Sequence, residues 1–169
     1  NRVKITAKSG GLEYVINGKT KNSLDDADKK VVAESVQTLI QVGVNGEQRA
    51  LQIYQEQGYD AVIKEIKRLK SDYVQHIYFG GLLSYEKHSD KDLLQILDEA
   101  QKTLASDYYT AEVIQKSASI YLNNPSVQKA FIDKAKNLKS DFYQAEVFKY
   151  LLKKSNLQGN EKTFVKAVS

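Results

Sequence analysis

Histidine, cysteine and glycine give this chain little scope for catalysis or metal binding. Its two histidines, His76 and His88, lie 12 positions apart, whereas two ligands on one helix face stand three or four residues apart. Cysteine is absent from the 169 residues, which excludes disulfides, thiolate zinc sites, iron–sulfur clusters and cysteine nucleophiles. The pair Gly80-Gly81 falls inside a predicted helix and not in a phosphate-binding loop, so we expect it to allow close packing of helices.

Glu112 and Glu146 are the candidates for a pair of catalytic carboxylates. They occupy equivalent positions in two copies of a repeat, so they should lie one helix spacing apart, about 8–10 Å. Retaining glycosidases need about 5–5.5 Å, and the inverting range of about 6.5–9.5 Å is barely met. Glu112 also precedes Lys116 by four residues, the spacing of an ion pair within a helix. We therefore predict that the chain is not an enzyme.

The segment His88-Ser89-Asp90-Lys91-Asp92 could contact a cation through its acidic side chains. A serine followed by acidic residues is, however, typical of a helix N-terminus, where both residue types stabilise the first turn. We interpret this segment as a helix cap, and the sequence predicts no metal and no other cofactor.

The charges are concentrated at the N-terminus. The net charge is +4, but residues 1–22 hold five basic groups and one acidic group, which leaves 20 of each sign in the rest of the chain. Nucleic-acid binding needs a concentrated basic face. The densest basic segment, residues 64–70, interleaves apolar residues at helical spacing, so we interpret it as a solvated helix face. The sequence predicts no nucleic-acid partner.

Two features bear on the location of the protein. No apolar run approaches the roughly 18 residues that a membrane-spanning helix requires, so we expect no membrane insertion by this segment. Methionine is absent, even at position 1, which is typical of a processed or excised chain. Together with the lack of cysteine, this leads us to expect an exported protein, periplasmic or at the cell surface.

The N-terminal 22 residues are predicted to form a β-hairpin. Residues 2–8 alternate apolar and basic side chains, as a half-buried strand does, and residues 12–16 form a second strand. The strands are followed by Asn17-Gly18, a strong hairpin-turn signal because both turn positions favour positive φ. Residues 19–21 could add a short third strand.

Helices are predicted from residue 23 onward. We expect them over residues 24–42, 47–57, 60–69, 72–85, 90–104, 107–122 and 125–138, with another that begins at Asp141. The first should be capped by Ser23 and should bury an apolar face that includes Val36 and Leu39. Asn124 supplies a cap before Pro125 at the first helical position. Residues 23–155 thus form the predicted helical domain, and residues 156–169 a tail or short helix.

A repeat of 34–35 residues organises this helical domain. It is marked by three Ser-Asp-aromatic corners: Ser71-Asp72-Tyr73, Ser106-Asp107-Tyr108 and Ser140-Asp141-Phe142. The second and third copies continue alike, as Tyr-x-Ala-Glu-Val. Such a period is typical of stacked supersecondary units. The predicted fold is therefore mostly α, an α-solenoid-like array of helix pairs with a short N-terminal β-hairpin.

The corners have a structural interpretation. Each serine or aspartate should cap the second helix of its unit, and Gln75 and Gln144 stand where they could complete a reciprocal capping box. The aromatic residue of each corner should pack between layers.

The repeat resembles a helical-repeat family of exported or membrane-tethered bacterial proteins, some of whose members lie C-terminal to sensor-type membrane metallopeptidases. The resemblance rests on the segments 106–113 and 140–147 and on the hairpin that ends at Asn17-Gly18. The zinc-binding His-Glu-x-x-His of those peptidases has no counterpart here. The resemblance therefore implies an accessory domain and not the protease.

Two classes of function agree with these features. One is a noncatalytic scaffold that presents a helical face or its hairpin edge to another protein or to the rest of its own parent chain. The 11 tyrosines favour it, because tyrosine is enriched at interfaces, although Tyr54, Tyr78 and Tyr121 fall at core spacing. The other is a sensor domain of a larger membrane-associated protein that binds a small molecule or peptide between helix layers. An exposed aromatic patch would favour the first, and an enclosed pocket with convergent polar groups the second.

Overall fold

The protein is mostly helical, with a small β-sheet at its N-terminus. The computed structural model describes residues 2–85, 88–121, 124–157 and 159–169, and within them it places nine α-helices and three strands. The chain divides into two compact units, Asn1–Val44 and Asn45–Ser169. The sequence predicts a domain boundary after residue 22. In the structure the first helix belongs instead to the same unit as the sheet.

The sheet of the first unit forms as the sequence predicts, with the third strand included. Strands β1 (Val3–Lys8), β2 (Gly11–Ile16) and β3 (Lys19–Lys21) pair antiparallel in the order β1-β2-β3. Asn17 and Gly18 adopt φ values of 50° and 83°, the left-handed conformation that a tight hairpin turn requires. The N-terminal element is therefore a three-stranded sheet built around the predicted hairpin.

Helix α1 (Asp26–Gln41) differs from its prediction in two respects. Its N-cap is Asp25, whose side chain accepts a hydrogen bond of 2.8 Å from Asp28 N, and not Ser23. Of the expected apolar face only Ile40 is buried, while Val36 and Leu39 are exposed. Helical spacing predicts which side chains share a face, but the face is buried only where another element covers it.

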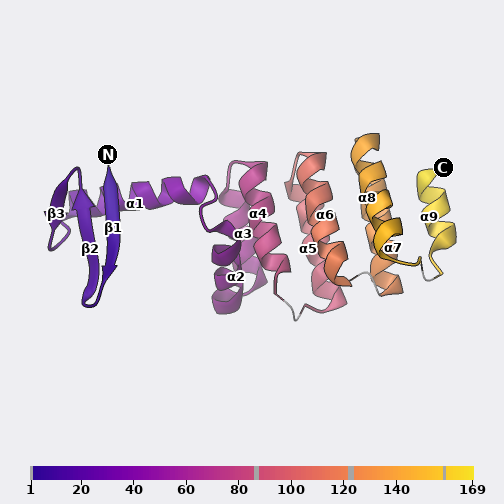
Figure 1. Ribbon diagram of the computed structural model, residues 1–169, viewed down its shortest axis with the longest axis horizontal. Helices are drawn as coiled ribbons and strands as arrows, with labels where there is room; N and C mark the ends of the chain where they lie inside the picture. Colours follow the sequence, from indigo (N-terminus) through magenta and orange to yellow (C-terminus); the bar gives the residue numbers. More distant parts are fainter. Residues whose placement is uncertain (1, 86–87, 122–123, 158) are drawn as a thin grey trace. The chain divides into compact units, whose positions relative to one another are not determined.

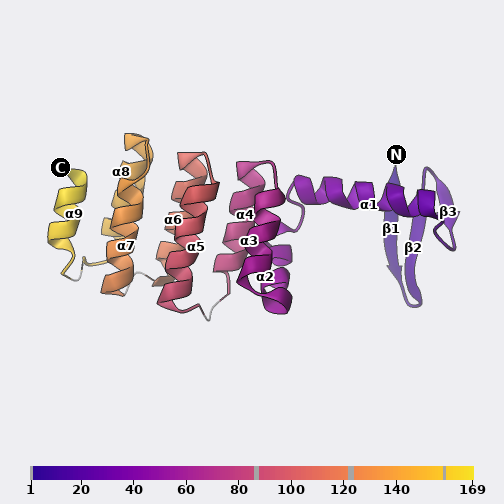
Figure 2. The same ribbon diagram turned by 180° about the vertical axis from the view of Figure 1, so that it is seen from behind.

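The second unit is an array of paired helices. They are α2 (Gly46–Gln57), α3 (Tyr59–Arg68), α4 (Asp72–Leu83), α5 (Asp90–Thr103), α6 (Asp107–Tyr121), α7 (Pro125–Lys136), α8 (Asp141–Lys154) and α9 (Glu161–Val168). Helices α2, α4, α6 and α8 stack side by side in one layer, and α3, α5, α7 and α9 form the other (Figure 1 and, from behind, Figure 2). This confirms the predicted array of helix pairs.

The core of the array lies between the two layers. Tyr78 and Phe79 of α4 and Phe131 of α7 are fully buried there, together with the aliphatic residues of α3, α5 and α6 that the helical spacing places inward. Asn124 caps α7 ahead of Pro125, as predicted, by accepting from Ser126 N at 3.0 Å. Local sequence signals therefore fix where most of the helices begin.

Helix α9, predicted as a tail or short helix, docks on α7. The Asn160 side chain donates to the Pro125 carbonyl at 2.8 Å, and the Gln128 side chain donates to the Asn156 carbonyl, also at 2.8 Å. These bonds join residues 28 to 35 positions apart, so α9 takes the place of the first helix of a further repeat.

The tyrosines of the array predict a loss of stability at alkaline pH. Burial raises the pKa of Tyr59 to about 12, and its hydroxyl donates to the Gln95 carbonyl at 3.3 Å. The folded state thus favours the neutral phenol, so its stabilising contribution is complete below about pH 10 and disappears as the pH rises toward 12. Tyr59→Phe should remove one tyrosine that titrates near pH 12 from the absorbance curve of phenolate formation. If the high-pH part of this absorbance curve is the same in Tyr59→Phe as in the wild type, the raised pKa does not belong to Tyr59.

Candidate functional site

The aspartate of each repeat corner binds the next repeat. Asp72 Oδ2 accepts a hydrogen bond of 2.7 Å from Ser106 N, and Asp107 Oδ2 accepts one of 2.6 Å from Ser140 N. In both cases the donor is the backbone N–H of the residue directly before the next helix of the layer that contains α4, α6 and α8. The corners therefore join α4 to α6 and α6 to α8 at one edge of the array.

The predicted capping boxes at the first and third corners are wrong. Neither Ser71 nor Ser140 makes a side-chain cap hydrogen bond. The Gln75 side chain instead donates to the Leu69 carbonyl at 3.0 Å, and that of Gln144 donates to the Leu138 carbonyl at 2.6 Å. The last carbonyls at the end of a helix have no partner within that helix. They therefore accept the hydrogen bond of the glutamine amide, which is then not used for a capping box.

Aromatic rings from the three corners form a continuous row, which we call the aromatic strip. It consists of Tyr73 and His76 of α4, Tyr108 and Tyr109 of α6, and Phe142 and Tyr143 of α8. The ring of His76 stacks on that of Tyr109 with centroids 4.6 Å apart, and the rings of Tyr108 and Tyr143 lie 5.7 Å apart. The strip thus crosses three successive repeats without a break.

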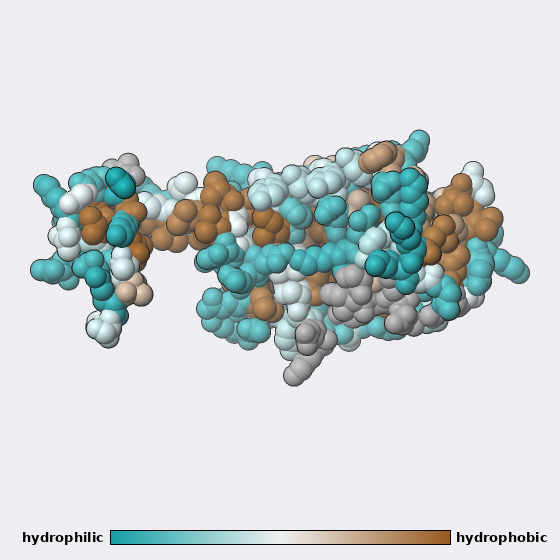
Figure 3. Space-filling model, in the orientation of Figure 1, coloured by the Kyte–Doolittle hydropathy of each residue, from teal (hydrophilic) through white to brown (hydrophobic). Residues whose placement is uncertain are grey.

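The first aromatic residue of each corner is exposed, which corrects the prediction that it packs between layers. Tyr73, Tyr108 and Phe142 expose 50%, 45% and 66% of their surface. Tyr109 and Tyr143, one residue further on, are half-buried and fill the contact between adjacent corners. In Figure 3, side chains of intermediate hydropathy gather along the upper edge of the array, over the first turns of α4 and α6.

Lysines flank the aromatic strip. Lys70 and Lys139 directly precede two of the corners, while Lys102 and Lys136 lie near the ends of α5 and α7, which lead into corners. All four are exposed. The N-termini of α4, α6 and α8 lie along this edge (Figure 1), where the helix dipoles add positive partial charge. The edge therefore combines exposed rings with exposed cations.

The two histidines lie in different environments. His88 is buried, with its Nε2 2.7 Å from the Leu82 carbonyl, whereas His76 belongs to the aromatic strip. Ser89 and Asp92 beside His88 form a capping box, and the hydrogen bonds from Ser89 lower the pKa of Asp92. The interpretation of residues 88–92 as a helix cap is thus correct. No group of three His, Asp or Glu side chains among the described residues could hold a metal ion.

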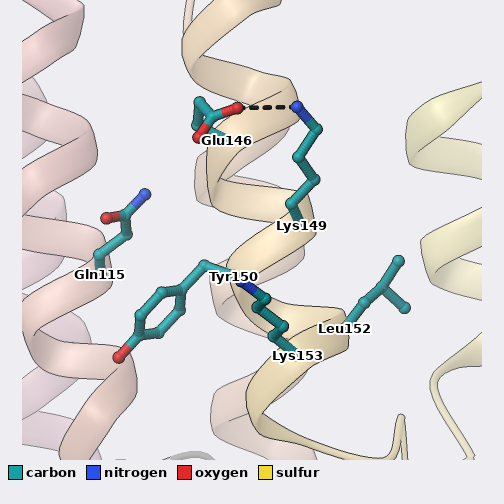
Figure 4. Close-up of a pocket in the computed structure, with 6 residues that line it drawn as sticks. All are labelled: Gln115, Glu146, Lys149, Tyr150, Leu152 and Lys153. Carbon is teal, nitrogen blue, oxygen red and sulfur yellow. Dashed lines mark hydrogen bonds and ion pairs between the residues drawn. The ribbon is translucent and has the colours of Figure 1, made fainter.

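The two candidate carboxylates line separate hollows. Glu112 lies with Glu47, His76 and Lys116 around a hollow of about 190 Å³. Glu146 lies 2.8 Å from Lys149 Nζ and lines a hollow of about 490 Å³ between α6 and α8 (Figure 4). The structure therefore does not bring Glu112 and Glu146 together as a catalytic pair.

The glycines of α4 bring α2 and α4 together, as the sequence predicts. A Cβ on Gly81 would lie 2.2 Å from the backbone oxygen of Glu47, so only glycine fits at this crossing. Across Gly80, Lys116 Nζ lies 2.5 Å from Glu47 Oε1 and joins α6 to α2. Lys116, for which the sequence predicts an ion pair with Glu112 within its own helix, thus also has an ion-pair partner on a neighbouring helix.

Two of the four basic side chains in segment 64–70 pair with carboxylates. Lys67 Nζ lies 2.6 Å from Glu99 Oε1 on α5, and Arg68 lies 3.9 Å from Glu65. These pairs reduce the positive charge available to a phosphate backbone and agree with a solvated helix face.

Comparison of the chain with protein-family models, with curated proteins and with solved structures finds no match. The resemblance to the bacterial helical-repeat family therefore stays a prediction. None of the described helices has the length and hydrophobicity needed to cross a membrane.

Sequence reasoning missed two properties of this site. It treated the corner aspartates as local caps, and it assigned no role to Tyr109 and Tyr143. The signal for the strip was present, since the second and third corners each carry two successive aromatic residues.

Proposed function

We propose that the chain is a noncatalytic protein-interaction domain that binds a partner protein through the aromatic strip. The observation that supports this most directly is the exposure of Tyr73, Tyr108 and Phe142 in one row on three stacked helices. Aromatic side chains are the commonest anchors of protein interfaces, and soluble proteins seldom leave them exposed in a contiguous patch. A row that repeats every 34 or 35 residues suits an extended segment of another protein.

Charge favours an acidic segment as the partner. Lys70, Lys102, Lys136 and Lys139 flank the strip, and a partner with acidic residues between apolar ones would complement both features. By the resemblance, the partner could equally be the rest of the protein's own parent chain, with the domain accessory to an exported or membrane-tethered protein.

The alternative, a sensor that encloses a small molecule, has less support. The hollow with convergent polar groups, around His76 and Glu112, has about 190 Å³, below the roughly 300–1,000 Å³ of typical ligand pockets. The hollow of about 490 Å³ between α6 and α8 is an open surface depression.

Selection of peptides on the full chain tests the proposed function. Peptides from a displayed random library that bind the wild type should bind the triple variant Tyr73→Ser, Tyr108→Ser and Phe142→Ser at least tenfold more weakly. The three rings are exposed, so the melting temperature should change little. The measurement is the dissociation constant of each selected peptide by fluorescence anisotropy.

A matched control removes exposed apolar side chains elsewhere. Leu12, Val42 and Val44 are exposed in the first unit, and replacing them with serine should change the affinities less than twofold. Selected peptides that bind the strip variant as tightly as the wild type would refute the aromatic strip as the binding surface.

A further inference from the structure

The exposed rings of the aromatic strip recur at a regular interval along the array. Tyr109 lies between Tyr73 and Tyr108, with ring centroids 6.1 Å and 4.9 Å from theirs. Tyr143 lies in the same way between Tyr108 and Phe142, at 5.7 Å and 5.1 Å. Each of α4, α6 and α8 thus carries one exposed ring, and packed helices lie about 8–10 Å apart. A ligand that runs along the strip therefore meets one ring in each such interval.

A polyproline II helix repeats at this interval. It has three residues per turn and rises about 3.1 Å per residue, so every third side chain returns to the same face about 9 Å further on. A β-strand returns to the same face after two residues, about 6.6–6.8 Å, which is too short for the spacing of the helices. An α-helix advances about 5.4 Å per turn, so it would meet a ring only at every second turn. Of these conformations, polyproline II places an equivalent residue on every ring once per turn.

The surroundings of the strip supply positive charge and hydrogen-bond donors. The four flanking lysines are exposed, and two of them, Lys102 and Lys136, each lie four residues before the serine of a corner. Their charge therefore recurs with the same period as the rings. A polyproline II helix has no internal hydrogen bonds, so each of its backbone carbonyls is an available acceptor, whereas the carbonyls of an α-helix are already used. The donors along the strip therefore favour a ligand with free carbonyls and acidic side chains.

We propose that the aromatic strip binds a proline-rich, acidic segment of the partner protein in the polyproline II conformation, with a proline at every third residue packed on Tyr73, Tyr108 and Phe142 in turn. This inference rests on the proposed function, because it specifies the partner of the same surface. Proline-rich segments recur as ligands of aromatic-lined surfaces, since they already hold the bound conformation and lose little entropy on binding. The acidic residue of each triplet faces the flanking lysines.

The probe is a synthetic peptide of four Pro-Ala-Glu triplets, N-acetylated and labelled with fluorescein at its C-terminus. Proline fixes its own φ and restricts the residue before it, so two of every three residues favour polyproline II. Fluorescence anisotropy should show saturable binding to the full chain. The matched control peptide has four Gly-Ala-Glu triplets, which keep the length and the charge. It should bind at least tenfold more weakly, because charge alone does not supply the rings' contacts.

Insertions into the probe test the spacing. One additional alanine after the second triplet turns all later prolines by a third of a turn, so they leave the face that contacts the rings. This peptide should bind at least fivefold more weakly than the probe. The matched control inserts a whole Pro-Ala-Glu triplet at the same place, which preserves the phase. Its affinity should differ from that of the probe by less than twofold.

Variants of the full chain locate the binding. The triple variant of the strip with serine in place of its exposed rings should bind the probe at least tenfold more weakly, and Lys102→Glu combined with Lys136→Glu at least fivefold. The control for charge is Lys91→Glu combined with Lys129→Glu, which changes exposed lysines near the beginnings of the same two helices. It should change the affinity less than twofold. All variants should keep the circular dichroism of the wild type, because the replaced side chains are exposed.

Three results would overturn this inference. The first is no binding of the probe up to millimolar concentration while peptides selected from the random library bind through the strip, which would leave the proposed function intact. The second is equal affinity for the probe and for the peptide with one inserted alanine. The third is binding that the triple variant of the strip leaves unchanged. If neither the probe nor any library peptide binds the full chain, the proposed function fails together with this inference.

Discussion

Gly81→Ala is expected to destabilise the helical array by about 3 kcal/mol, the upper end of what overpacking a core usually costs. The added Cβ would lie 2.2 Å from the backbone oxygen of Glu47 and 2.6 Å from its Cα. Both atoms belong to the backbone of α2, so no side-chain rotation relieves the overlap. Helices α2 and α4 would have to separate at their crossing, and the measurement is the midpoint of urea unfolding.

Gly80 provides a control at the adjacent residue of the same helix. A Cβ there would lie 2.8 Å from Lys116 Nζ and 2.9 Å from Glu47 Oε1, the mobile ends of two long side chains. These ends can move, and alanine is about 1 kcal/mol better than glycine inside a helix. Gly80→Ala should therefore change the free energy of unfolding by less than about 1 kcal/mol in either direction. Equal losses for the two variants would show that the helices do not cross at Gly81 as described.

Local signals in the sequence predict most of the elements. Asn17-Gly18 predicts the hairpin because positive φ at both positions is a property of the dipeptide itself. Asn124 and Pro125 predict the start of α7 for the same kind of reason, a cap and a fixed φ. The period of the Ser-Asp corners predicts the stacking, since each unit has an apolar face that only a neighbour can cover.

The properties of the candidate site depend on residues far apart in the sequence, which is why reasoning within one corner missed them. Asp107 could satisfy a donor in its own helix or one 33 residues away, and only the packing of α6 on α8 selects the second. Likewise, a corner aromatic residue could point inward or outward. Tyr109 and Tyr143 occupy the contact between corners and leave Tyr108 and Phe142 exposed.

Helix α1 shows the same limit for an apolar face. Its spacing of valine, leucine and isoleucine predicts an amphipathic helix, yet Val36 and Leu39 are exposed. Its contacts within the first unit include Asp28, whose Oδ2 lies 2.7 Å from Lys21 Nζ of β3. The helical spacing of apolar residues predicts which face of a helix would contact a neighbouring element. It does not show that such an element is present.

Asp107→Ala tests whether the corners hold the repeats together. Its carboxylate accepts the Ser140 N–H at 2.6 Å, and hydrogen bonds to charged groups contribute about 1.5–3 kcal/mol. The substitution also removes an acid from the first turn of α6, worth about 0.3–1 kcal/mol. We expect a loss of about 2–3 kcal/mol in the free energy of urea unfolding.

Asp141→Ala is the matched control, because it removes the equivalent first-turn acid of α8 where no N–H of a following described repeat is accepted. It should cost only the helix-dipole contribution, below about 1 kcal/mol. The difference between the two variants then measures the bond between repeats. Hydrogen exchange should locate it: in Asp107→Ala the Ser140 amide and the first turn of α8 should lose protection, while the sheet of the first unit keeps its own. The opposite result would be equal losses of stability for Asp107→Ala and Asp141→Ala, with the Ser140 amide still protected. It would show that the array stacks through its apolar faces alone, and that the corner aspartates act only within their own helices.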